Sequence, residues 1–282
     1  MNQMTQCLRA FQWRLMLLWV LWMLIPTAIL VYPLWHMLAD SLDYSVHAAS
    51  IAQQMDMTVF ADLMAAHGRN ALAIESGAIV ALIATLLISP LLSGMAASAA
   101  RAPETLGIKA LTAGGLAEYP RMLRMLVWAV VPLGLAIAAG GAAMDWAAEH
   151  VETAVTAADE RVWKWAAAIL LALLLAIANA SLDAGRAALA IERRRTSAVK
   201  AWWSGTMMLL RRPFSTLGVY FLISGTGLAI VAALSVARLN VPSASLAGFV
   251  GALLVTQLIV VAVAWMRSAR LFAMVELARK PR

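Results

Sequence analysis

Charged residues are scarce in this chain of 282 residues, at 13% of the total, whereas hydrophobic residues make up 63%. A soluble globular domain carries about 25% charged residues. The mean hydropathy of +0.80 and several long apolar runs are typical instead of a protein that crosses a membrane more than once. The composition therefore argues against a soluble domain.

Cysteine is also nearly absent, since Cys7 is the single one. This excludes an intramolecular disulfide and a cysteine-based metal cluster. The nucleophile-elbow, P-loop and dinucleotide-binding motifs do not occur. The histidines, His36, His47, His67 and His150, lack the one-turn spacing of a helical metal site. We therefore expect no enzymatic activity, no cofactor and no metal.

Six segments contain the roughly 20 apolar residues that a helix needs to cross a membrane. They are residues 15–38, 74–100, 122–143, 163–190, 214–237 and 246–266. The first is longer than the apolar core of a cleavable signal peptide, so we expect a retained signal-anchor. The prediction is a single all-α domain, residues 1–282, built as a bundle of six transmembrane helices.

The distribution of the 22 lysine and arginine residues predicts the orientation of these helices. Most of them fall in segments on one side if the N-terminus is cytoplasmic, and cytoplasmic loops are enriched in Lys and Arg. The inside loops are then 101–121 and 191–213, the outside loops are 39–73, 144–162 and 238–245, and both termini are inside. We expect a bacterial inner-membrane protein. Its net charge of +7 reflects topology, so no nucleic-acid partner is predicted.

The inside loop 191–213 contains an apolar stripe at helical spacing in "VKAWWSGTMMLLRR". This pattern predicts an amphipathic helix in the headgroup region, with Trp202 and Trp203 as interfacial anchors. We expect further interfacial helices in 39–73 and 144–162.

A basic inner surface is the first candidate site. Such a surface would bind anionic lipid headgroups or an acidic partner, although the same charges could simply set the topology. Its candidate residues are Lys109, Arg121, Arg124, Arg193, Arg194, Arg195, Lys200, Trp202, Trp203, Arg211 and Arg212.

Polar side chains within the spans are the second set of candidates, because a charge inside a membrane is costly. Asp183 and Arg186 are either a docking or gating pair or an intrahelical pair with Arg186 reaching the boundary. Glu75 is either a helix N-terminal carboxylate or an outside-facing ion site. The remaining candidates, which a permease would place around a polar cavity near the midplane, are Asn179, Ser224, Thr226 and Gln257.

Two stretches of the chain echo each other. "IKALTAGG" from Ile108 aligns with "VKAWWSGT" from Val199, and a Gly-Leu-Ala-Ile motif follows in both, at Gly134 and at Gly227. Both copies run from an inside loop into an outward-going span, which indicates a possible parallel repeat. Chance similarity between membrane sequences rich in small residues is the alternative.

Several segments carry a resemblance that covers most of the chain. "LDAGRAALAIERRRTSAVKA" followed by "LLRRPFSTLGVY" resembles a class of uncharacterised bacterial six-span membrane proteins. It is also loosely similar to the membrane region of bacterial glycerophosphodiester phosphodiesterases. Their catalytic domain is absent here, so the resemblance implies a membrane fold and no phosphodiesterase chemistry.

Together these features predict a non-enzymatic component or accessory subunit of a membrane assembly, with membrane lipids and a membrane or cytoplasmic protein as partners. The alternative is a permease or lipid-handling transporter with a pathway between the two repeats. A polar midplane cavity would favour the transporter, and an exposed apolar or charged patch would favour the assembly subunit.

Overall fold

The computed structural model describes residues 9–43, 57–152, 156–241 and 245–279, and these residues are helical with short connections and no strand. The prediction of an all-α fold is therefore confirmed. The helices are α2 (Trp13–Leu42), α4 (Met57–Arg69), α5 (Ala71–Arg101), α6 (Ile108–Trp128), α7 (Val130–Glu152), α8 (Ala157–Ile191), α9 (Ala198–Arg211), α10 (Pro213–Leu239) and α11 (Leu246–Arg279). Six helical segments of this described part are long and apolar enough to cross a membrane, which is consistent with a multi-pass membrane protein.

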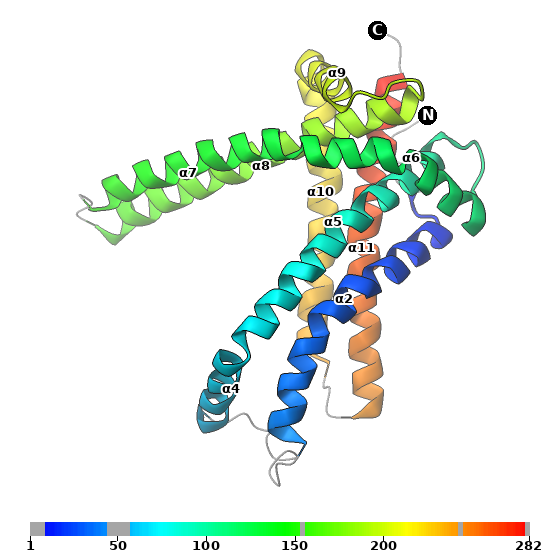
Figure 1. The fold of residues 1–282 in the computed structure, drawn as a ribbon. Coiled ribbons are helices and arrows are strands. Elements are labelled where there is room, and N and C mark those ends of the chain that lie inside the picture. Colours follow the sequence, from blue (N-terminus) through cyan, green and yellow to red (C-terminus); the bar gives the residue numbers. More distant parts are fainter. Residues whose placement is uncertain (1–8, 44–56, 153–155, 242–244, 280–282) are drawn as a thin grey trace.

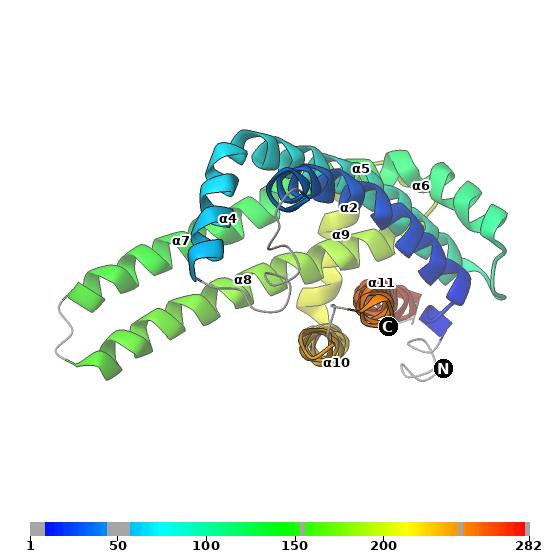
Figure 2. The same cartoon turned by 90° about the horizontal axis from the view of Figure 1, so that it is seen from below.

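The long helices form three antiparallel hairpins, α2 with α5, α7 with α8, and α10 with α11. All three meet at one end of the molecule, where α6 and α9 also lie (Figure 1). We call this the convergent end. From it, the α7–α8 hairpin points in a different direction from the other two hairpins, and the view from below shows it extending well clear of α10 and α11 (Figure 2).

The buried core lies mainly at the convergent end. It is formed by the last turns of α5, α8 and α11, with fully buried side chains such as Met95, Leu189 and Met274. Away from this end large apolar side chains are exposed, among them Trp35 at 70% and Trp165 at 67%. Lipid tails are as apolar as these side chains, so a membrane helix loses nothing by exposing them. Lipid tails would cover such side chains in helices that cross a membrane.

The helices extend beyond several of the predicted spans. The segment 122–143 is shared between α6 and α7, and α6 already begins at Ile108, within the predicted inside loop. α11 continues to Arg279, well past residue 266. The predicted outside segment 144–162 holds the end of α7 and the start of α8 instead of a separate helix, while 39–73 holds α4 and residues 44–56, which lie outside the described residues.

The two short helices at the convergent end pack through glycine. A Cβ placed on Gly205 of α9 would lie 2.9 Å from the carbonyl oxygen of Ala184 in α8, and one on Gly94 of α5 would lie 2.9 Å from the carbonyl oxygen of Gly115 in α6. Each short helix thus packs on the long helix that precedes it in the chain. The two aligned segments of the sequence share this packing, although a duplication stays a prediction.

We expect Gly205→Ala to destabilise the protein. Alanine favours a helix over glycine by about 0.5–1 kcal/mol, but the new methyl group would meet the α8 backbone, and overpacking of this kind costs about 1–3 kcal/mol. The matched control is Gly218→Ala on α10, where a Cβ meets nothing within 4 Å. Thermal unfolding of the detergent-solubilised protein should show a lower Tm for Gly205→Ala alone, and equal Tm values would contradict the close approach.

Candidate functional site

Two carboxylates are buried at the convergent end. Glu118 of α6 is 2% exposed and Asp183 of α8 is 7% exposed. A carboxylate removed from water is strongly unfavourable unless it is paired and hydrogen-bonded. Each of these carboxylates lies among arginine side chains, and the two groups are named here the Glu118 cluster and the Asp183 cluster.

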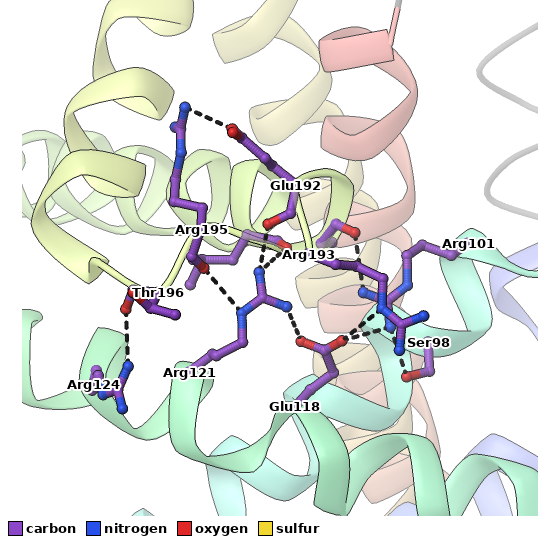
Figure 3. A network of polar contacts seen from close by, with 11 residues as sticks. Ser98, Arg101, Glu118, Arg121, Arg124, Glu192, Arg193, Arg195 and Thr196 are labelled. Atoms are coloured by element: carbon purple, nitrogen blue, oxygen red, sulfur yellow. Dashed lines mark hydrogen bonds and ion pairs between the residues drawn. The ribbon is translucent and has the colours of Figure 1, made fainter.

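In the Glu118 cluster both carboxylate oxygens are paired (Figure 3). Glu118 Oε1 lies 2.8 Å from an Arg101 Nη2 atom, and Oε2 accepts a hydrogen bond from Arg121 Nη1. Arg193 Nε lies 4.0 Å from Oε1, and its side chain is 73% exposed. The strong pairs are therefore those with Arg101 of α5 and Arg121 of α6.

Both of these arginines also donate to the main chain at the end of α8. Arg121 donates to the carbonyl oxygens of Leu189 and Glu192 at 2.7 Å and to that of Arg195 at 3.1 Å. Arg101 donates to the carbonyl oxygen of Ala190 at 3.1 Å. The last carbonyl groups of a helix have no partner within it. The Glu118 cluster supplies partners for them and so joins α5 and α6 to the α8–α9 connection.

The Asp183 cluster joins α8, α10 and α11. Asp183 Oδ1 accepts from Arg186 Nη1 at 2.6 Å, and Oδ2 lies 3.3 Å from Arg270 Nε. Arg270 Nη1 donates to Tyr220 Oη and to Ser224 Oγ, both at 3.2 Å. Its guanidinium carbon is also 5.0 Å from the centroid of the Tyr220 ring. One carboxylate therefore holds two guanidinium groups from different helices.

A cavity of about 190 Å³ lies beside Asp183. Its charged lining consists of the guanidinium groups of Arg186, Arg267 and Arg270 with Asp183 as the acidic group, so positive charge is in excess. The rest of the lining is Trp19, Leu86, Ser89, Ser93, Ala96, Leu126, Asn179 and Leu271.

The predicted basic residues divide into two groups. Arg121, Arg124 and Arg195 are used within the protein, where Arg124 donates to the Thr196 carbonyl oxygen at 3.1 Å and Arg195 pairs with Glu192 at 2.6 Å. The second group consists of exposed side chains that donate no hydrogen bond within the described part of the chain: Lys109, Arg193, Arg194, Lys200 and Arg211. Arg212 is half-buried and borders a groove with Arg211.

The two predicted anchor tryptophans have different environments. Trp203 is 58% exposed. Trp202 is half-buried, its Nε1 donates to Ser181 Oγ at 3.0 Å, and its ring lies edge-on to Trp128 at 5.6 Å between centroids. Trp202 therefore packs α9 onto the protein, and Trp203 is the one available to an interface.

The predicted intramembrane residues are brought together in part. Asn179 lines the Asp183 cavity, and Ser224 accepts the hydrogen bond from Arg270. Thr226 is exposed and donates to its own helix, and Gln257 is half-buried on α11. Glu75 is exposed near the start of α5, away from the convergent end. These residues do not form one cavity.

The sequence analysis did not identify four charged residues of the two clusters and the cavity: Arg101, Glu118, Arg267 and Arg270. Glu118 falls in the predicted inside loop 101–121, where an acid is expected in water. Arg267 and Arg270 follow the predicted end of the last span. One feature of the sequence could have placed Arg267 and Arg270 within a helix. It is the apolar spacing of "LFAMVEL" at 271–277, which continues α11 beyond both arginines.

The buried charged groups of the convergent end form ion pairs and hydrogen bonds. No group of three or more His, Cys, Asp or Glu able to hold a metal occurs among the described residues. His36 pairs with Asp40 at 3.4 Å, His150 lies against Trp163, and His47 lies outside the described residues. The chemistry that the convergent end offers is the binding of an anion by guanidinium groups.

We expect Glu118→Gln to destabilise the fold strongly. The substitution keeps the side-chain shape but leaves Arg101 and Arg121 without a carboxylate, and breaking a buried ion pair in this way costs about 3–5 kcal/mol. The control is Glu160→Gln, which removes an exposed pair with Lys164 and should change Tm little. Thermal unfolding in detergent separates the two, and similar Tm values would show that the Glu118 cluster does not hold the convergent end together.

The likeness to the membrane region of phosphodiesterases stays a prediction, and two residues of the segment that carries it, Asp183 and Arg186, belong to the Asp183 cluster. Comparisons of the chain with protein-family models, with curated proteins and with solved structures return no match.

Proposed function

We propose that this protein is a non-enzymatic subunit of a membrane assembly, in which the α7–α8 hairpin packs against another membrane-embedded protein. The observation that carries the proposal is the position of this hairpin. It leaves the convergent end in its own direction (Figure 1), and α7 packs on α8 and, at its start, on α6. The far side of α7 is thus open along its length.

That open side of α7 carries a stripe of small residues, flanked by larger exposed apolar side chains such as Val131, Leu135 and Ile137. A Cβ on Gly134 or on Gly141 would meet nothing within 4 Å, and Ala138 between them is exposed. At about 100° per residue these three positions share one face of α7. They point about 100° to 160° away from Gly140, where a Cβ would lie 3.0 Å from Leu171 Cβ of α8. Membrane helices associate through small residues that let their backbones approach closely. The stripe on α7 therefore fits a further helix.

The exposed basic residues support contact with the membrane surface or with an acidic partner. A groove of about 590 Å³ between α8, α9 and α11 is lined by Trp203, Arg211 and Arg212 among others. An aromatic ring beside cationic side chains suits the headgroup region, where both groups find partners. On this proposal the convergent end is cytoplasmic and the protein belongs to a bacterial inner membrane.

A permease or lipid-handling transporter is the second candidate. The cavity beside Asp183 favours it, since the cavity is polar and lies among helices of different hairpins. The positions of Thr226 and Gln257 outside that cavity do not support a wider polar pathway.

We expect the double variant Gly134→Ile/Gly141→Ile to lose a stoichiometric partner that the wild-type protein retains. Bulky side chains on this stripe would hold a second helix away from the α7 backbone. Native mass spectrometry after mild extraction measures the loss, and Tm shows that the monomer is intact. The matched variant is Gly218→Ile/Gly225→Ile on α10, at the same spacing and also with nothing within 4 Å. If the partner is lost from the α10 variant alone, or is lost from neither variant, α7 is not the assembly surface.

A further inference from the structure

We propose that the cavity beside Asp183 binds a phosphate group through Arg186, Arg267 and Arg270. The group would be the phosphate of an anionic phospholipid headgroup or a soluble phosphate, which offer the same oxygen atoms. This inference does not rest on the assembly proposed above, because the cavity lies within the chain and away from the open side of α7.

The charge of the cavity is the first argument. Three guanidinium groups and one carboxylate line it. Asp183 already divides its two oxygens between Arg186 and Arg270. Arg186 and Arg270 are half-buried and Arg267 is exposed, and positive charges that are partly withdrawn from water are stabilised by a balancing anion. A bound phosphate would supply that anion.

Arg267 is the second argument. Among the described residues it makes no hydrogen bond or ion pair, and its guanidinium carbon lies 6.0 Å from the ring centroid of Trp19. An arginine has five N–H donors in a planar fork, and this geometry matches two oxygens of one phosphate. Arg267 therefore has N–H donors available at the cavity, whereas Arg186 and Arg270 also form ion pairs with Asp183.

Neutral donors on the opposite wall are the third argument. A hydroxyl within a helix commonly donates to a carbonyl of the preceding turn, as Thr85 and Ser235 do here. Ser89 and Ser93, one turn apart on α5, line the cavity and make no hydrogen bond to the described part of the chain. Asn179 donates through Nδ2 to the Leu175 carbonyl oxygen, which leaves its second N–H. Donors from three helices, α5, α8 and α11, thus surround one space.

The volume of the cavity limits which part of a ligand can enter it. A water molecule occupies about 30 Å³, so about 190 Å³ holds a phosphate group with a few water molecules and no acyl chain. Leu86 and Leu126 also line the cavity, and Leu86 is 43% exposed. An apolar margin of this kind suits a lipid whose phosphate enters while its chains remain in the bilayer.

The test measures lipid binding to the full-length protein in detergent by native mass spectrometry. The probes are dioleoyl phosphatidylglycerol, dioleoylglycerol with the same chains but no phosphate, and inorganic phosphate. We expect one retained phosphatidylglycerol, no retained dioleoylglycerol, and a loss of affinity of about 10- to 100-fold in Arg267→Gln, the range for a charge-assisted hydrogen bond. Arg194→Gln removes an exposed arginine outside the cavity and should leave this lipid bound.

Ser93→Ala is the second variant, because it removes a donor without changing the charge or the fold. It should weaken binding several-fold at an unchanged Tm. If inorganic phosphate displaces phosphatidylglycerol, the ligand is a soluble phosphate. If it does not displace phosphatidylglycerol, the ligand is the lipid. The proposal is overturned if the wild-type protein retains neither phosphate-containing probe, or if Arg267→Gln and Ser93→Ala bind as tightly as Arg194→Gln.

Discussion

The pairing of two buried carboxylates with arginine is the interaction on which the rest of this structure depends. Apolar surface alone does not drive helices together within lipid, and most of the length of the hairpins accordingly exposes its apolar side chains. At the convergent end Glu118 of α6 pairs with Arg101 and Arg121, and both of these arginines also donate to the main chain of α8. Asp183 of α8 pairs with Arg270 of α11 and so joins two hairpins.

The number and approximate position of the long helices could be predicted from the sequence, because each of them contains a long apolar run. Their relative directions could not. A side chain that meets lipid and one that meets another helix are equally apolar, so Trp165 and Met95 do not differ in pattern. The predicted spans also stop short of the helix ends, as for α11, because charge marks the edge of an apolar run and not the last helical turn.

The candidate site, too, could be predicted from the sequence only in part. Asp183 and Arg186 could be paired from their spacing, since residues three apart share a helix face. Their partner Arg270 lies on another helix, and no local pattern relates the two. Glu118 could not be identified because it lies in a segment predicted to be a loop in water, where burial of a carboxylate is unexpected. The predicted basic residues lie on α6, on α9 and next to the ends of α9, and only their contacts in the structure separate those that donate to main-chain carbonyls from those that do not.

The placement of Arg270 has a consequence for the order in which the chain is made. Arg270 lies on α11, which follows α8, the helix of Asp183, in the chain. During synthesis Asp183 therefore has Arg186 as a partner before Arg270 has been made. Until the α10–α11 hairpin is in place, Asp183 has half of its ion pairs, and a buried carboxylate with incomplete pairing is unfavourable.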